Sequence, residues 1–243
     1  MIEVTPPGHA PGVWAPTLRR TPRHRLPRRL RGARVLVTAA HADDETLGAG
    51  GLMRALRARG ARFTVVVATD GAAAFPGLGA ERRLELARAR QHETHAALGE
   101  LGIDADTHFL GLPDGRAAEH LPRLTDALRT LGASADLVLA PWRGDPHPDH
   151  RAVGEAAAVA TVSSSLIEYP IWMRHGQLPS GVPREHLRVL RLTRGQARRK
   201  QRAIRAHRSQ VTIWDDGHQP VLPPHVTALF ADGLEPFFVR EAE

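Results

Sequence analysis

The chain has 243 residues, of which 42% are hydrophobic and 24% charged, so it is long and apolar enough for one domain with a full hydrophobic core. It contains no cysteine, which excludes disulfide bonds, thiolate metal ligands and cysteine nucleophiles, and leaves histidine and carboxylate as ligands for any bound metal. The net charge of +7 comes almost wholly from arginine, but aromatic residues make up only 5% of the chain, so we expect no nucleic-acid partner.

Residues 1–31 are rich in proline and arginine and show little apolar periodicity, which predicts an extended N-terminal arm ahead of a single domain over residues 32–243. The N-terminus also lacks the apolar core of a signal peptide, and the apolar runs of the chain are too short to cross a membrane. We therefore expect a cytoplasmic protein without a transmembrane segment.

From residue 34 onward, short apolar runs alternate with segments of helical periodicity. Strands are predicted over residues 34–40, 62–71, 107–115, 135–142 and 165–172. Helices are predicted over residues 44–60, 79–102, 120–132, 149–164 and 193–209, and the C-terminal sequence EPFFVRE predicts an edge strand. This alternation predicts an α/β fold with a Rossmann-like, mainly parallel sheet and helices on both faces.

Ligands of such sheets bind beyond the carboxyl ends of the strands. The loops that follow four predicted strands should therefore lie along one rim, over residues 40–45, 70–79, 111–115 and 142–150. Two of these loops, the first and the last, are rich in histidine and aspartate.

The first loop carries the sequence HADDE, from His41 to Glu45, between a predicted strand and a predicted helix. One aspartate here is explained as a helix cap, because its oxygen can accept hydrogen bonds from the free amides of the first turn. A cap does not explain His41 or the second of the two adjacent carboxylates. A divalent cation at the turn explains them together, since His41 and Asp44 can bind one ion from two sides.

The last loop, PWRGDPHPDH, supplies Asp145, His147, Asp149 and His150. A single histidine in a loop is more often an ordinary surface residue, but two such loops that the topology brings together favour a metal site. Two histidines and one carboxylate leave coordination positions open, as in catalytic zinc sites. A second carboxylate can then act as a base, and the remaining histidine can stabilise an oxyanion or protonate an amine. This combination predicts an amide hydrolase.

At these residues the sequence resembles the LmbE-like, PIG-L-type family of zinc-dependent de-N-acetylases, which act on N-acetylglucosamine-type sugars. The family motif His-Pro-Asp-Asp-Glu is similar to His41-Ala42-Asp43-Asp44-Glu45, and its motif His-Pro-Asp-His is matched fully by His147-Pro148-Asp149-His150. Alanine at position 42 replaces the usual proline, a change that we expect to be tolerated. The resemblance covers most of the chain from Arg34 onward.

The resemblance implies a zinc ion, or another divalent ion such as Fe²⁺, held by His41, Asp44 and His150. It implies that Asp43 is the general base. It also implies that His147, oriented by Asp149, is the acid or the oxyanion stabiliser.

Four further residues are candidate substrate contacts: Arg90, Arg143, Asp145 and Asp114. An exposed helix arginine is almost as good an interpretation of Arg90. Asp145 stands where some relatives place a tyrosine that polarises the carbonyl, and a carboxylate cannot donate to an oxyanion. Either His147 then carries more of the stabilisation, or Asp145 binds the sugar.

The leading hypothesis is a metal-dependent hydrolase that removes an N-acyl group, expected to be N-acetyl, from an amino-sugar-containing small molecule or glycoconjugate. One alternative is an amidase for another N-acylated metabolite. A second is a non-catalytic protein that binds phosphate or nucleic acid through its arginines.

Overall fold

The computed structural model describes residues 8–9, 12–75, 77–161, 164–213 and 219–239. Within these ranges seven strands form one sheet in the order β3-β2-β1-β4-β5-β7-β6. The strands are β1 Arg34–Ala39, β2 Arg62–Thr69, β3 Ala105–Leu112, β4 Leu137–Pro141, β5 Ser165–Tyr169, β6 Leu187–Arg191 and β7 Leu234–Val239. Strands β1 to β5 are parallel, and β7 is antiparallel to both β5 and β6. The predicted Rossmann-like, mainly parallel α/β fold is confirmed.

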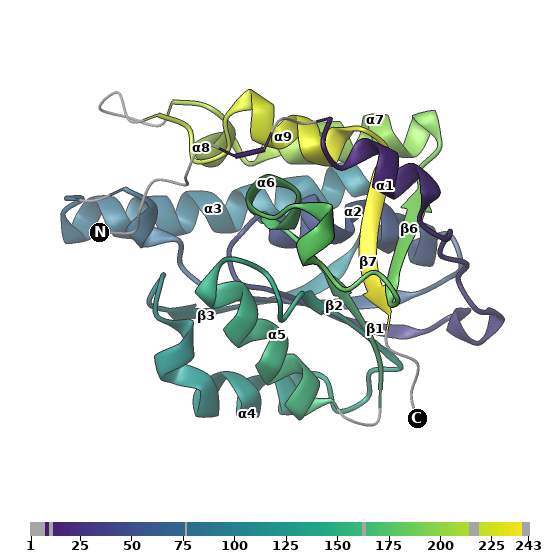
Figure 1. Cartoon of the computed structure of the whole chain (residues 1–243). Coiled ribbons are helices and arrows are strands. Elements are labelled where there is room, and N and C mark those ends of the chain that lie inside the picture. The colour runs from purple at the N-terminus through teal and green to yellow at the C-terminus, as the bar shows by residue number, and fades with distance from the viewer. Residues whose placement is uncertain (1–7, 10–11, 76, 162–163, 214–218, 240–243) are drawn as a thin grey trace.

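Helices cover both faces of the sheet (Figure 1). One face carries α2 Asp44–Arg57, α3 Ala80–Leu101, α7 Arg194–Ala206 and α9 Pro224–Ala231, and the other carries α4 Leu121–Leu131 and α5 Pro148–Ala160. Three shorter helices in the described chain are α1 Ala15–Arg20, α6 Met173–Gly176 and α8 Arg208–Val211. None of the helices within the described ranges is long and apolar enough to cross a membrane.

Each central strand contributes to two cores because successive side chains point to opposite faces of the sheet. In β1, Val35 and Val37 belong to the core beneath α2 and α3, whereas Leu36 belongs to the core beneath α4 and α5. The same alternation recurs in β4. Burial on both faces explains why these strands appear in the sequence as continuous apolar runs.

The connections of the sheet diverge between β1 and β4. From β1 the chain passes through α2 to β2 on one side, and from β4 it passes through α5 to β5 on the other side. Such a divergence leaves a crevice at the carboxyl ends of the two strands, where ligands of this class of fold bind. The two loops that border it are the two loops rich in histidine and aspartate.

The N-terminal segment differs from the prediction of an extended arm. Trp14 and Leu18 are 1% and 0% exposed, and they pack with Trp142 and Phe238 in a third apolar cluster. The indole Nε1 of Trp14 donates to the carbonyl oxygen of Gln177 at 2.8 Å. The extended-arm prediction is therefore wrong for this segment, because two apolar side chains four residues apart form one face of α1. Residues 1–7 and 10–11 lie outside the described ranges, and the boundary at residue 32 stays a prediction.

The C-terminal strand also differs from its prediction. β7 is not an edge strand, because it lies between β5 and β6, and residues 240–241 of the predicted strand lie outside the described ranges. β6, for which no strand was predicted, forms that edge, and its buried residues Leu187 and Val189 alternate with the part-buried Arg188 and Leu190.

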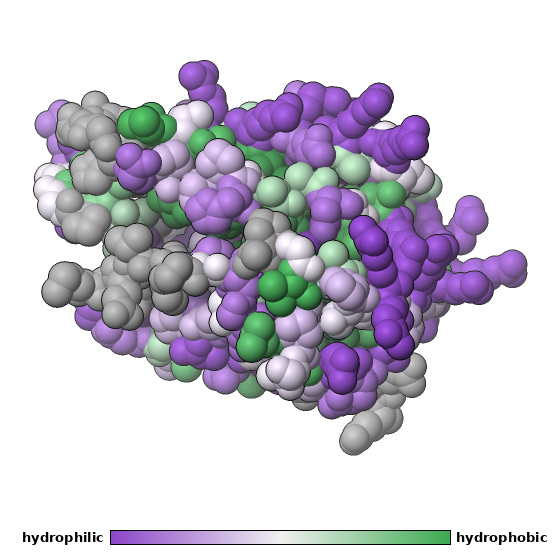
Figure 2. Space-filling model, turned by 45° about the horizontal axis from the view of Figure 1, so that its top comes forward, coloured by the Kyte–Doolittle hydropathy of each residue, from purple (hydrophilic) through white to green (hydrophobic). Residues whose placement is uncertain are grey.

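The predicted basic helix is present as α7, and its exposed and buried sides are clearly separated. Thr193 caps it in a capping box with Gln196, and Ala203 and Ile204 pack into the core. Arg198 and Arg202 are exposed. Figure 2 shows that hydrophilic residues cover much of this side of the molecule, as expected for a solvated helix face.

Candidate metal centre

The loops after β1 and β4 meet. Nδ1 of His41 lies 3.2 Å from Nε2 of His150, although the two residues are 109 positions apart in the sequence. His41 is 15% exposed in its side chain, and His150 is fully buried in the first turns of α5. The central expectation of the sequence analysis, that these two imidazoles come together, is met by the structure.

The carboxylate of Asp44 completes a set of three converging side chains, and it turns a different oxygen toward each imidazole. Its Oδ2 accepts the backbone N–H groups of Ala40 and His41 at 3.0 and 2.8 Å, which fixes the carboxylate across the strand-to-helix turn. Its Oδ1 lies 3.3 Å from Nε2 of His150, and its Oδ2 lies 3.6 Å from Nδ1 of His41. Donor atoms bound at about 2.0 Å to a tetrahedral zinc ion are about 3.3 Å apart, so these separations fit one ion.

The outer nitrogens of both rings face carboxylates. Nδ1 of His150 lies 2.9 Å from Oδ1 of Asp145. Nε2 of His41 lies 3.1 Å from Oδ1 of Asp114 and 3.3 Å from Oδ2 of Asp149.

An ionised carboxylate only accepts hydrogen bonds, so the outer nitrogens carry the hydrogens of the neutral rings. The inner nitrogens of His41 and His150 then present lone pairs toward each other and toward Asp44. These lone pairs and the carboxylate oxygens repel one another unless a positive charge lies between them. They are therefore suited as ligands of a dication.

The electrostatics of the site also favour positive charge. Burial by itself lowers the pKa of His150, but the carboxylates of Asp44 and Asp145 outweigh it and raise that pKa to about 9. Burial likewise opposes the charged form of His41, whose pKa is nevertheless raised well above its ordinary value by Asp114, Asp149 and Asp44. Without an ion, the rings neutralise the surrounding acids by taking up protons, and a dication would displace those protons.

Asp43 lies in the same turn and has a different environment from Asp44. It is 4% exposed, and burial together with the charge of Asp44 raises its pKa to about 7. By contrast, the pKa of Asp44 lies well below its ordinary value, because His150 and His41 outweigh the opposing effect of burial. Two adjacent aspartates are thus separated into a permanently ionised carboxylate and one that exchanges a proton near neutral pH.

His147 is the third imidazole of the site, with its ring centroid 4.8 Å from those of His41 and His150. It is the N-cap of α5, where its Nδ1 accepts the backbone N–H of Asp149 at 3.2 Å. The neutral ring therefore carries its hydrogen on Nε2. Burial and the charges of the other two imidazoles lower the pKa of His147 to about 4, so at neutral pH it is an uncharged donor.

Asp149 orients His147 in a different way from the one that the resemblance implies. The contact runs through the backbone N–H of Asp149 and does not involve its carboxylate. The carboxylate accepts the N–H groups of Gly115 and Ala117 at 2.7 and 3.0 Å and faces Nε2 of His41. The side chain of Asp149 therefore positions His41 and the loop after β3.

Asp145 is not placed as a sugar contact. It is 1% exposed, and both of its oxygens accept hydrogen bonds from the protein itself, which corrects the sequence-based expectation. Asp114 is also engaged internally, since it faces His41 and accepts the backbone N–H of Ala73 at 3.0 Å. Arg143 forms an ion pair with Glu168, with Nε of Arg143 2.8 Å from Oε1 of Glu168. Its role in substrate binding stays a prediction.

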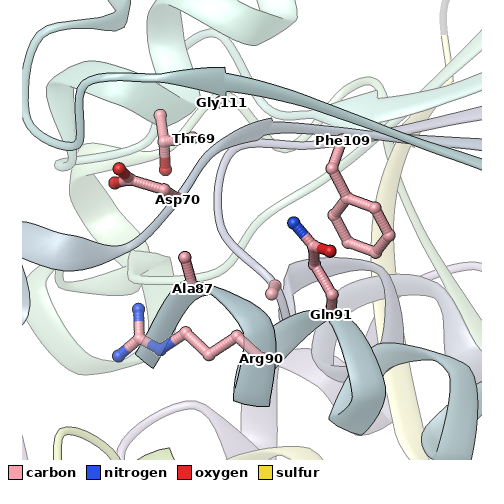
Figure 3. Close-up of a pocket in the computed structure, with 8 residues that line it drawn as sticks. Thr69, Asp70, Ala87, Arg90, Gln91, Phe109 and Gly111 are labelled. Atoms are coloured by element: carbon pink, nitrogen blue, oxygen red, sulfur yellow. The ribbon is translucent and has the colours of Figure 1, made fainter. Parts of the chain in front are cut away.

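Arg90 keeps free hydrogen-bond donors. It is 2% exposed, so it is not an exposed helix arginine, and its Nη1 donates to the carbonyl oxygen of Gly71 at 2.8 Å. Within the described part of the chain, its Nε and Nη2 have no hydrogen-bond partner. Arg90 lines a small pocket of about 20 Å³. Figure 3 shows it on α3 at the edge of this pocket, with Asp70 and Thr69 opposite and Phe109 at the far side.

Several residues that hold the site were missed by sequence reasoning. The side-chain amide of Gln210 donates to the carbonyl oxygen of Ala42, inside the first motif. The hydroxyl of Tyr169 donates to the carbonyl oxygen of Thr38 at 2.5 Å. These contacts join residues 168 and 131 positions apart, and nothing in the local sequence signals them.

Fold and site together define the class of protein: a Rossmann-like α/β protein with a buried histidine–carboxylate centre at the point where the sheet connections diverge. A family model described as PIG-L, GlcNAc-PI de-N-acetylase, matches residues 36–161, a stretch that contains both histidine motifs. The chain belongs to the PIG-L family. The resemblance noted in the sequence is thereby confirmed.

Individual relatives agree with this assignment. The 1D-myo-inositol 2-acetamido-2-deoxy-alpha-D-glucopyranoside deacetylase of Mycolicibacterium vanbaalenii is 29% identical over 255 residues, covering 84% of this chain and 89% of that protein. The structure of the conserved protein TT1542 from Thermus thermophilus is 28% identical, with a TM-score of 0.63 over 87% of this chain and 96% of that one. N,N'-diacetylchitobiose deacetylase from Pyrococcus horikoshii shares the fold, with 23% identity and a TM-score of 0.66 over 95% and 91% of the two chains.

Proposed function

We propose that this chain is a metal-dependent N-deacetylase that removes the acetyl group from an amino sugar in a small molecule or glycoconjugate. The observation that carries the proposal is the convergence of three side chains. Nδ1 of His41 lies 3.2 Å from Nε2 of His150, and the two oxygens of Asp44 lie 3.3 and 3.6 Å from these nitrogens. Two imidazoles and one carboxylate suit Zn²⁺, and Fe²⁺ suits the same ligands. A non-catalytic phosphate binder would not need this donor set.

A dication held by these three side chains would polarise the amide carbonyl and make a nearby water molecule more acidic. Asp43 lies in the same turn as the proposed ligands His41 and Asp44, and it is a buried carboxylate that can accept a proton and later return it. We assign Asp43 as the general base. It takes a proton from the water molecule as the water oxygen bonds to the carbonyl carbon.

His147 then stabilises the oxyanion. Its Nδ1 is occupied by the N–H of Asp149, so the hydrogen on Nε2 is the one available for donation to the negatively charged oxygen. As the C–N bond breaks, the proton held by Asp43 passes to the leaving amine, and the products are acetate and the free amino sugar.

The substrate class rests on the family and on Arg90. The family model and the relatives are described as deacetylases of N-acetylated amino sugars. Arg90 offers two buried N–H donors to the pocket beside the metal centre, which suits the oxygen atoms of a sugar.

The test is metal analysis of the purified protein, followed by an amine-release assay on N-acetylated amino sugars. We expect about one divalent ion per chain, amine release by the loaded protein, and loss of amine release after chelation with recovery on adding Zn²⁺. Substoichiometric metal binding at saturating Zn²⁺, or full activity in metal-free protein, would contradict the proposal.

A further inference from the structure

Asp145 lies behind the metal centre, between His150 and the chain that follows β5. Its Oδ1 faces Nδ1 of His150 at 2.9 Å and accepts the backbone N–H of His147 at 3.1 Å. Its Oδ2 accepts the backbone N–H groups of Ile171 and Trp172, each at 2.9 Å. The carboxylate is completely buried, and all four of its contacts are with hydrogen-bond donors.

We propose that Asp145 is a positioning residue of the metal centre, which holds the imidazole of His150 with Nε2 toward the ion and ties it to the connection after β5. The inference rests on the proposed metal-dependent function, since it concerns a ligand of the same centre. A carboxylate behind a ligating histidine fixes its tautomer and orientation and increases its basicity.

The two ligating histidines differ in how they are supported. His41 faces two carboxylates, Asp114 and Asp149, which come from different loops. Among the described residues, Nδ1 of His150 has one partner, Asp145. Loss of Asp145 should therefore affect the metal more than loss of either carboxylate at His41.

The chemistry of the four contacts requires a carboxylate. An ionised carboxylate offers about four acceptor positions on two oxygens, whereas an amide offers one acceptor oxygen and an NH₂ group that only donates. In Asp145→Asn, either the His150 side or the Ile171–Trp172 side must face that NH₂ group. The substitution therefore removes an acceptor that holds the ring of His150 in position, while the side chain at position 145 keeps almost the same volume.

The experiment compares Asp145→Asn with Glu235→Gln. Glu235 is equally buried and accepts the N–H groups of Gly51 and Leu52 as well as a bond from Lys200, but it contacts no proposed metal ligand. Zn²⁺ affinity is measured on the full chain by competition with a chromophoric chelator, and the melting temperature is measured in the metal-free state.

We expect both variants to melt at a lower temperature than the wild type in the metal-free state. Only Asp145→Asn should lose Zn²⁺ affinity, by about 10- to 100-fold. Substitution with Co²⁺ should also change the visible absorption spectrum of Asp145→Asn and leave that of Glu235→Gln like the wild type. If the two variants bind Zn²⁺ equally well, the inference is overturned while the proposed function stands.

A measurement on the wild type covers the case in which Asp145→Asn does not fold. Histidine ¹⁵N spectra of the Zn²⁺-loaded protein should show His150 protonated at Nδ1 and metal-bound at Nε2. The opposite tautomer overturns the positioning role of Asp145. A wild-type protein that binds no divalent ion overturns the proposed function, and this inference with it.

Discussion

The loop after β1 and the loop after β4 are both rich in histidine and aspartate, but the carboxylates of the two loops make different contacts. In the first, Asp44 lies within 3.6 Å of the inner nitrogens of His41 and His150, and the neighbouring Asp43 is buried with its pKa raised to about 7. In the second, the carboxylates of Asp145 and Asp149 face imidazoles and backbone N–H groups. Carboxylates in both loops accept backbone N–H groups, since Ala40 and His41 donate to Asp44. The loops differ because only the second turns its carboxylates toward the outer nitrogens of the imidazoles.

The largest effect should come from the first loop. Asp43→Asn keeps the size of the side chain but removes its ability to accept a proton, and it leaves Asp44, His41 and His150 in place. We expect kcat to fall by about 10²- to 10⁴-fold. Bound zinc should remain at the wild-type level by metal analysis, and a variant that loses both metal and activity would contradict the division of roles within this loop.

A smaller loss is expected at the one residue of the second loop that we propose faces the substrate. His147→Ala removes the proposed oxyanion donor and should reduce kcat by about 10²- to 10³-fold.

His147→Asn provides the matched control, since asparagine is a good N-cap for α5. It should regain the stability that alanine loses, about 1 kcal/mol measured by denaturant unfolding, without regaining kcat. If asparagine restores kcat as well, the role of His147 is confined to capping the helix.

The unequal support of the two histidines predicts a graded effect on metal binding. Asp114→Asn removes one of two carboxylates from His41, and Asp149 remains within 3.3 Å of the same nitrogen. We expect Zn²⁺ affinity to fall by less than about 10-fold, below the lower bound expected for Asp145→Asn. Chelator competition measures both, and a larger loss in Asp114→Asn would reverse the comparison.

The last prediction concerns stability, at the residues that lie behind the first loop. His207 is fully buried, with Nε2 3.3 Å from the hydroxyl of Thr46, and burial and the charge of Arg90 lower its pKa to about 3. The unfolded chain binds a proton there below its ordinary pKa of 6.5, and the folded chain does not until about pH 3. The stability that this group contributes is therefore present above pH 6.5 and is lost as the pH falls toward 3.

The measurement is the free energy of unfolding of metal-free protein between pH 4 and 7, for the wild type and for His207→Gln. The wild type should lose stability relative to the variant by up to about 1.4 kcal/mol for each pH unit below 6.5. Parallel curves for the two proteins would show that His207 is protonated in the folded state.

Local patterns in the sequence were sufficient for most elements of the fold. The continuous apolar runs of β1 and β4 and the helical spacing of α2 and α3 are set by neighbouring residues, so they could be predicted without tertiary information. α1 was missed because two apolar residues stand among prolines and arginines. β6 was missed because its buried positions, Leu187 and Val189, make too short a pattern.

Some features of the candidate site could likewise be predicted from the sequence, and others could not. His41, Asp44 and His150 could be selected from the sequence, because ligand types and spacing within each loop are local properties and the order of strands brings the loops together. The partners of Asp145, Asp114 and Asp149 could not, because a carboxylate has the same identity whichever donors surround it.

Residue types and their local spacing were sufficient to predict the α/β fold, the two histidine motifs and the absence of cysteine chemistry. The folded chain was needed to show that the carboxylates of Asp145, Asp114 and Asp149 face imidazoles, and that Arg90 is buried beside the small pocket. Hydrogen-bond partners and burial depend on segments that only folding brings together, up to 108 positions apart for His41 and Asp149, and they set both the direction of a ring and the pKa of a carboxyl group.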